Sequence, residues 1–196
     1  KKNSLTSLGK KMALLPVDPR LSRMLLYATK HGAAKEILII ASALSVEDPL
    51  CGVNGQARIF RNPESDFLSY LNLWSELQRR IRGQKLSSSL LKKFCSDYNL
   101  MPLRIREWYD AHRQLERLCR SIHGFLNQPD RKASSEAIHK SLLAGLKDGI
   151  AFRVDKGLYH GISGEIRVFP SSALFRKNHQ WILFAEIVET SRVYGR

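Results

Sequence analysis

The sequence is poor in cysteine and in acidic residues, and it has no apolar run of membrane-spanning length. Its three cysteines, Cys51, Cys95 and Cys119, are far apart and form no C-x-x-C pair, so neither a disulfide framework nor a zinc knuckle is predicted. Reduced thiols are typical of the cytoplasm, where we expect the protein to act. No apolar stretch approaches the roughly 20 residues that a spanning helix requires.

Motifs of several enzyme classes are also missing. There is no G-x-x-x-x-G-K-[ST] phosphate loop and no strand-borne acidic pair for magnesium, both of which P-loop ATP chemistry requires. The six histidines lack H-E-x-x-H spacing, and no G-x-S-x-G elbow occurs. We therefore expect no catalytic residue, cofactor or metal ion in this segment, which should be inactive as an enzyme on its own.

What the sequence has in excess is positive charge. The 196 residues include 32 Lys and Arg against 18 Asp and Glu, a formal net charge of +14. A field of this sign attracts polyanions. Nucleic acid is the first candidate partner, and it is favoured over an anionic membrane surface.

Apolar spacing and capping residues predict helices as far as Gly149. Asp18 and Pro19 supply an N-cap and a first helical residue, and Gly32 ends that helix. Residues 37–44 are apolar nearly all round, which is typical of the central helix of a bundle. Further helices are expected after Asn62-Pro63 and after Ser87-Ser88-Ser89. The longest helix should follow Pro102, with an apolar stripe that reaches Phe125 and a break at residues 128–130. A last helix opens with Ser134-Ser135-Glu136 and ends at Gly149.

Beyond Gly149 the pattern changes to short alternating runs. Residues 151–155, 158–162 and 166–169 are predicted strands separated by glycines, and residues 181–189 a longer strand. Such strands suit the wall of a small barrel, whose interior we expect Phe169, Phe175 and Trp181 to fill. The fold class is therefore α+β, an all-α bundle followed by a small β-barrel.

The opening run carries a family resemblance. Residues 5–21, LTSLGKKMALLPVDPRL, fit the pattern L-T-x-L-G-x-x-M-A-x-x-P-x-D-P-x-L. In it Thr6 is placed to cap a short helix and Pro16 to stop it. The run resembles the junction between the winged-helix and helical-bundle domains of DEAH-box RNA helicases.

Two further regions support the same resemblance. Residues 60–68, 72–74 and 95–108 look like stretches of the helical bundle, or ratchet, domain of bacterial HrpA-type DEAH-box helicases. Residues 166–175 and 181–196 are similar to the oligonucleotide-binding fold that ends these helicases, with its patterns F-P-x-S-x-L-F and W-V-x-x-x-E-x-V-E-T-S-R.

The resemblance implies a domain order. Residues 1–17 would end a winged helix, residues 18–149 would form the ratchet-like bundle, and residues 150–196 an oligonucleotide-binding fold that we expect to be truncated. Because no initiating methionine is present, we expect a piece of a longer chain. ATP and Mg²⁺ would then belong to motor domains outside these residues.

Candidate RNA-binding residues come from the basic stretch between residues 79 and 120 and from the barrel. On the long helix most of the arginines lie near one face, and a cluster of cations suits a phosphate backbone. The alternative is a solvated face with pairs such as Glu116 and Arg120. The resemblance adds Asn99, Arg104 and Arg106, at a loop and helix start, although both arginines could instead contact adjoining domains. The predicted set is Asn99, Arg104, Arg106, Arg113, Arg117, Arg167, Ser171, Ser172, Thr190 and Arg192.

Two functions remain open at this point. The first is an accessory segment of an ATP-dependent RNA helicase that contacts and guides single-stranded RNA beside the motor domains. The second is a regulatory module that docks on those motor domains or on an activating protein; in the wider family, glycine-rich G-patch cofactors use neighbouring surfaces.

Overall fold

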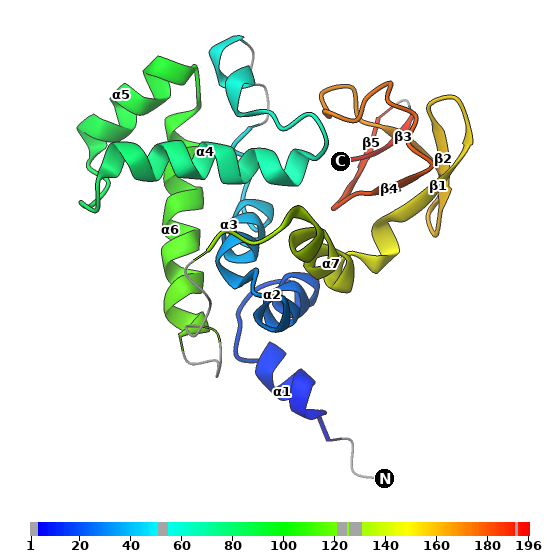
Figure 1. Ribbon diagram of the computed structural model, residues 1–196, viewed down its shortest axis with the longest axis horizontal. Helices are drawn as coiled ribbons and strands as arrows, with labels where there is room; N and C mark the ends of the chain where they lie inside the picture. The colour runs from blue at the N-terminus through cyan, green and yellow to red at the C-terminus, as the bar shows by residue number, and fades with distance from the viewer. Residues whose placement is uncertain (1–3, 51–54, 121–124, 126–130, 191) are drawn as a thin grey trace.

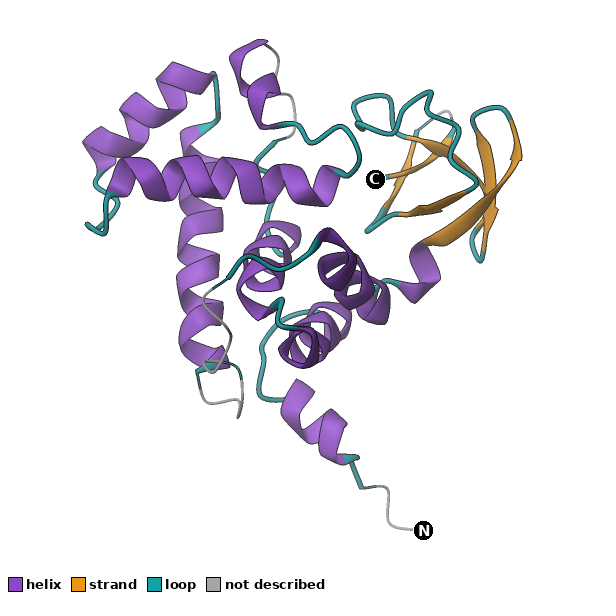
Figure 2. Cartoon of the chain, in the orientation of Figure 1, coloured by secondary structure: helices purple, strands orange, loops and turns teal. Residues whose placement is uncertain are grey.

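The computed structural model describes residues 4–50, 55–120, 125, 131–190 and 192–196. Within these ranges an all-helical bundle is followed by a six-stranded sheet. The helices gather on one side of the molecule and the sheet on the other (Figures 1 and 2). The α+β fold class is thereby confirmed.

The N-terminal helices follow their capping residues. They are α1 (Ser7–Met12), α2 (Pro19–His31) and α3 (Ala34–Leu44). The Thr6 hydroxyl accepts from the Gly9 amide at 3.0 Å, and an Asp18 carboxylate oxygen accepts from the Arg20 amide at 2.7 Å. Gly32 ends α2 in the left-handed region, with φ of 67°.

The later helices depart from expectation at their ends. They are η1 (Gly55–Phe60), α4 (Asp66–Ile81), α5 (Ser88–Tyr98), α6 (Pro102–Cys119), α7 (Ser135–Gly145) and η2 (Lys147–Gly149). Helix α4 begins only at Asp66, because the Asn62 side chain accepts from the Glu64 and Ser65 amides and holds a turn there. The predicted break at residues 128–130 lies outside the described residues. None of the described helices has the length and apolar character needed to cross a membrane.

Helix α7 ends earlier than the sequence suggested, at Gly145 and not at Gly149. A Cβ on Gly145 would lie 2.3 Å from the Arg20 carbonyl oxygen of α2, so only glycine permits this close approach. The chain then turns into η2, which leads directly into the first strand.

Helix α3 occupies the middle of the bundle, as its apolar sequence predicted. Ile37 and Ile40 are fully buried, and α3 packs on α2, α4, α6 and α7. The indole nitrogen of Trp108 in α6 donates to the Ser42 hydroxyl at 3.0 Å. This buried contact ties α6 to α3.

The sheet is open and strongly curled. Its strands are β1 (Ile150–Asp155), β2 (Leu158–Gly161), β3 (Gly164–Val168), β4 (Trp181–Leu183), β5 (Ile187–Glu189) and β6 (Val193–Gly195), in the order β4-β1-β2-β3-β6-β5. Neighbouring strands are antiparallel except for β3 and β6. Among the described residues no ladder joins the edge strands β4 and β5, which agrees with the expected incomplete barrel.

The long strand predicted over residues 181–189 is wrong, because the chain forms two short strands there. The Phe184 amide donates to the Gly149 carbonyl at 3.0 Å, and the Phe184 ring packs on Gly195, where a Cβ would approach it to 2.9 Å. This anchor turns the chain between β4 and β5.

The expected aromatic filling of the barrel is also wrong in part. Trp181 is 61% exposed and Phe175 is 39% exposed, while Phe169 is half-buried beside Tyr194. The core consists instead of Ala151, Tyr159, Ile166, Val168, Ile182 and Phe184. Because side chains alternate along a strand, burial of Ile182 directs Trp181 outward.

The bundle and the sheet meet at the start of α4. The Asp66 carboxylate accepts from the Ser172 hydroxyl and, at 2.8 Å, from the Ala173 amide. The Lys177 ammonium donates to the Pro63 carbonyl, and Leu183 and Ala185 pack against the bundle core. Polar and apolar contacts therefore both join the two parts.

Candidate nucleic-acid interface

Three predicted residues at the turn between α5 and α6 take part in internal contacts. Asn99 ends α5 in the left-handed conformation, with φ of 54°. Arg104 forms an ion pair with Glu47, and its side chain is only 14% exposed. The Arg106 guanidinium donates to the Leu86 carbonyl at 3.2 Å. Each therefore has a structural role, and RNA binding by these three stays a prediction.

Two other predicted arginines lie on the outward side of α6. Arg113 and Arg117 are exposed, and the Arg113 guanidinium lies 6.0 Å from the Tyr109 ring. The Arg117 Nε donates to the Arg113 carbonyl at 3.3 Å. Within the described part of the chain, neither forms an ion pair with a carboxylate.

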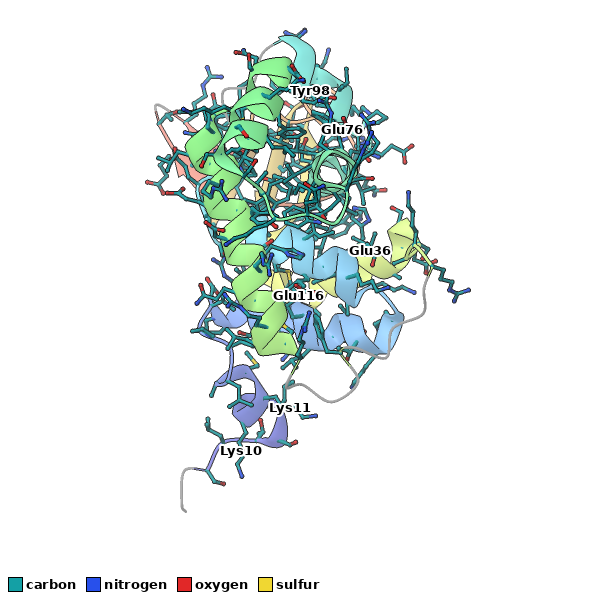
Figure 3. All side chains as sticks on the ribbon, turned by 90° about the vertical axis from the view of Figure 1, so that its left-hand side faces the viewer. Lys10, Lys11, Glu36, Glu76, Tyr98 and Glu116 are labelled. Atoms are coloured by element: carbon teal, nitrogen blue, oxygen red, sulfur yellow. The ribbon has the colours of Figure 1, made fainter. Side chains whose placement is uncertain are left out.

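Other arginines at the end of α6 and on the neighbouring α4 do form ion pairs with carboxylates. Arg120 pairs with Glu116 at 3.4 Å, as the solvated-face alternative expects. Arg79 donates to Glu76 through two nitrogens, each at 2.6 Å. These bonds, with those from Tyr98 and Arg80, lower the pKa of Glu76 to about 2. Figure 3 shows α6 along this side of the molecule, with Glu116 on it and Glu76 and Tyr98 towards one end.

The turn between α4 and α5 carries two further exposed cations. Arg82 and Lys85 are exposed in this turn, and the Arg106 contact with Leu86 holds the turn against the start of α6. No ion pair involves either of them among the residues that the structure describes. We call Arg82, Lys85, Arg113 and Arg117 the basic face; the carboxylates Glu107 and Asp110 are also exposed on α6.

Of the predicted residues in the barrel, some form internal hydrogen bonds and others are exposed. The Ser172 hydroxyl donates to Asp66 and accepts from the Leu174 amide at 3.0 Å. Thr190 is hydrogen-bonded to the Arg192 backbone, through its amide at 3.0 Å. Ser171 and Arg192 are exposed, and Arg167 is half-buried on β3 opposite Tyr194.

The structure does not bring the predicted residues into one site. Helix α5 and the start of α6 lie on the far side of the bundle from the sheet (Figure 1). The basic face and the barrel residues are therefore separate surfaces, and a single bound strand would have to pass along the molecule to contact both.

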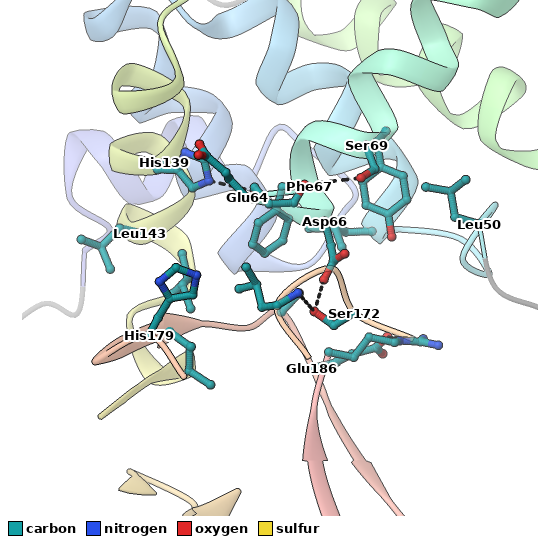
Figure 4. Close-up of a pocket in the computed structure, with 18 of the residues that line it drawn as sticks. Leu50, Glu64, Asp66, Phe67, Ser69, His139, Leu143, Ser172, His179 and Glu186 are labelled. Carbon is teal, nitrogen blue, oxygen red and sulfur yellow. Dashed lines mark hydrogen bonds and ion pairs between the residues drawn. The ribbon is translucent and has the colours of Figure 1, made fainter. Parts of the chain in front are cut away.

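A cavity at the junction of bundle and barrel was not foreseen from the sequence. Its volume is about 650 Å³, and it is lined by residues of α4, α7 and the barrel (Figure 4). The Tyr70 hydroxyl donates to Asp48 at 3.1 Å, and burial raises the pKa of Tyr70. Asp66 belongs to this lining, and its partner Ser172 lies 106 residues later in the chain, so no local pattern indicates the pair.

His139 lies in the same lining. Its Nδ1 is 2.7 Å from the Ser135 carbonyl oxygen and its Nε2 is 2.9 Å from the Ser65 hydroxyl. A carbonyl can only accept, so in the neutral ring Nδ1 carries the proton and Nε2 accepts from Ser65. This bond joins α7 to the start of α4.

Comparisons with known proteins agree with the resemblance seen in the sequence. The model of the ratchet-like helicase associated domain (HA2) matches residues 18–97, and the model of the oligonucleotide/oligosaccharide-binding (OB) fold matches residues 138–196. The ATP-dependent RNA helicase HrpA of Escherichia coli is 40% identical over 98% of this chain. Its homolog from Haemophilus influenzae is 39% identical over the whole chain.

A more distant relative is found in a eukaryote. The ATP-dependent RNA helicase DHX33 of Drosophila melanogaster is 31% identical over 98% of this chain. The chain spans about 15% of the length of the two bacterial relatives. With its helical bundle and open oligonucleotide-binding sheet, the chain corresponds to the C-terminal region of HrpA-type DEAH-box RNA helicases, with their helicase associated domain and OB fold.

Proposed function

We propose that this chain contacts single-stranded RNA and guides it beside the motor domains of a longer, ATP-dependent helicase. In this proposal residues 1–17 end a winged helix, residues 18–149 act as the ratchet-like bundle and residues 150–196 as the OB fold. ATP and Mg²⁺ would bind to motor domains outside these residues. The relatives' names describe RNA helicases, and this chain's net charge of +14 suits a polyanion.

The basic face is the observation that carries the proposal. Its four cations are exposed and have no carboxylate partner among the described residues. A cation that already has such a partner gains little from a phosphate, because it must first give up its ion pair. Unpaired cations can each neutralise a phosphate and release counterions. Arg113 and Arg117 are thus strong candidates within the predicted set.

The test is RNA binding by a charge-reversal pair and by a matched control. Arg113→Glu/Arg117→Glu should bind a short single-stranded RNA at least about tenfold more weakly, and the slope of log affinity against log salt should fall by about 1.4, or about 0.7 per lost phosphate contact. Lys10→Glu/Lys11→Glu changes the net charge equally on α1, where both lysines are exposed, and should keep most of the affinity. Equal losses in both variants would contradict a localised site.

One observation favours docking as a second candidate function. Helix α1 buries none of its residues, and Leu5, Leu8 and Leu14 on and beside it are 62%, 40% and 61% exposed. Exposed apolar residues in a group are typical of a surface that meets another protein part. Leu5→Ser/Leu8→Ser should then reduce binding to the separately produced motor domains and leave RNA affinity unchanged.

A further inference from the structure

Three exposed rings lie side by side on neighbouring strands of the barrel. Phe152 on β1 pairs across the sheet with His160 on β2 and with Trp181 on β4. The centroid of the Phe152 ring is 5.8 Å from each of the other two. Phe152 is 41% exposed and Trp181 is 61% exposed. We call these three residues the aromatic row.

The aromatic row is not needed for the barrel core. The residues that precede or follow them on the same strands, Ala151, Tyr159 and Ile182, face inward and are buried. Large rings that a fold leaves in water at adjacent positions forgo the free energy of burial. Their exposure therefore suggests an external partner for this face of the sheet.

The surroundings of the row suit a nucleic acid. His160 is paired across the sheet with Glu165 on β3, and Arg167, two residues further along β3, lies on the same face. Lys156 is exposed in the turn after β1. At its other end the row reaches the cavity between bundle and barrel, because Trp181 lines that cavity. An RNA strand that lies on the aromatic row would thus meet cations near the row and an apolar recess at its end.

We propose that bases of single-stranded RNA stack on Phe152 and Trp181, with His160 at the edge of the same platform. The inference rests on the proposed function, and it assigns base contacts to residues outside the predicted set. Aromatic rings accept any base by stacking, because every base has a π-face. The row would therefore hold RNA without strong sequence preference, while the basic face holds phosphates.

Trp181 provides a direct spectroscopic probe of this contact. The chain has three tryptophans, and Trp74 and Trp108 are 6% and 0% exposed, so quenching by an added ligand reports mainly on Trp181. A short oligo(U) should quench the emission, whereas an abasic ribose-phosphate oligomer of the same length should bind with little quenching. Oligo(U) should also bind more tightly than the abasic oligomer.

Variants separate stacking from other contacts. Phe152→Leu/Trp181→Leu keeps an apolar surface but removes the rings, and it should weaken oligo(U) binding about tenfold while abasic binding stays unchanged. Trp181→Phe keeps a ring and should retain most of the oligo(U) affinity. Near-UV and far-UV circular dichroism check that the exposed substitutions leave the fold intact.

The outcomes distinguish this inference from the proposed function. If Phe152→Leu/Trp181→Leu binds oligo(U) as tightly as the original chain does, stacking on the aromatic row is refuted. This holds also if the variant no longer associates with the motor domains. Equal affinities for oligo(U) and the abasic oligomer would refute it too and leave phosphate binding intact. Arg113→Glu/Arg117→Glu should weaken both oligomers alike; if neither oligomer binds the original chain even at low salt, the proposed function itself fails.

Discussion

His112 faces the interior of the bundle from α6. Its ring centroid lies 4.2 Å from that of Trp74, and burial lowers the pKa of His112 from 6.5 to about 4. Between these two values the unfolded chain binds a proton at this histidine and the folded chain does not. The free energy of unfolding should therefore fall as the pH is lowered from about 6.5 to about 4.

Replacing this histidine should remove that pH dependence. His112→Phe keeps a ring beside Trp74 but cannot titrate. We expect the original chain to lose about 2 kcal/mol more stability than the variant between pH 7 and pH 5, as measured by urea unfolding at both values. The substitution His31→Phe, at an exposed position at the end of α2, provides a control. If His112→Phe lost as much stability between pH 7 and pH 5 as the original chain does, His112 would not be the source of the pH dependence.

At the residue scale, contacts within one helical turn were predictable and longer ones were not. Thr6, Asp18 and Gly32 act as caps because each affects only groups two to four positions away. Arg104 was expected at an RNA surface, yet it pairs with Glu47, 57 residues earlier. Sequence spacing carries no information about such a partner before the bundle is known.

At the scale of elements, Glu76 joins α4 to α5. It accepts from the Arg79 Nε at 2.6 Å on its own helix and from the Tyr98 hydroxyl at 2.8 Å on α5. The hydrogen bond from Arg79 is the largest cause that lowers the pKa of Glu76 from 4.5 to about 2. Because the folded pKa is the lower one, the stabilisation is complete above about 4.5 and is lost as the pH falls through about 2.

Removing the charge should therefore destabilise the helix pair at neutral pH. Glu76→Gln is expected to lower the free energy of unfolding by about 2 kcal/mol at pH 7, and the difference from the original chain should shrink as the pH approaches 2. Urea unfolding across this range gives the comparison. Glu136→Gln, which removes an exposed pair with Lys140 on α7, should leave stability unchanged; matching effects of the two substitutions would refute a special role for Glu76.

Helices and strands were predicted well where the residues that begin or end them lie close by in the sequence. Helix α5 follows its N-cap Ser87 and α6 begins at Pro102, close to where the residues alone placed these two helices. The division of residues 181–189 into β4 and β5 was missed, because it depends on Phe184 binding to Gly149 and packing on Gly195. Apolar residues on both faces are equally compatible with one long strand or two short ones.

At the scale of the whole molecule, Asp66 holds the barrel against the bundle. Its two carboxylate oxygens accept from the Ser172 hydroxyl and the Ala173 amide, and the chain between these partners includes α4 to α7 and strands β1 to β3. Charge-assisted hydrogen bonds of this kind are stronger than neutral ones. This carboxylate should therefore contribute strongly to the junction, beside the apolar contacts of Leu183 and Ala185 with the bundle core.

The substitution Asp66→Ala tests that dependence. It should speed hydrogen exchange of the Ala173 amide and lower the free energy of unfolding by about 2 kcal/mol, while exchange in the core of α3 stays slow. Glu64→Ala is the matched control, because Glu64 is an exposed neighbour whose side chain accepts no hydrogen bond among those described. Unchanged exchange at Ala173 in Asp66→Ala would show that apolar packing alone holds the barrel in place.

The overall α+β organisation could be predicted from the sequence, whereas the candidate site could be predicted only in part. The change of pattern at Gly149 predicted the step from helices to strands. The cavity between bundle and barrel and the exposure of Trp181 depend on which face of each strand the fold buries. That choice is made by packing between distant segments, which one sequence does not reveal.

Helix α2 packs along α7 so closely that Gly145 has no room for a side chain against Arg20, and the Arg23 Nε donates to the Ala144 carbonyl 121 residues later. A ribosome adds about 5–20 residues each second. The buried side of α2 must then wait on the order of ten seconds for its partner to be made. Over that interval the Met24 side chain, which packs against Gly145 in the folded chain, lacks this cover, and a chaperone that binds apolar segments would find it there.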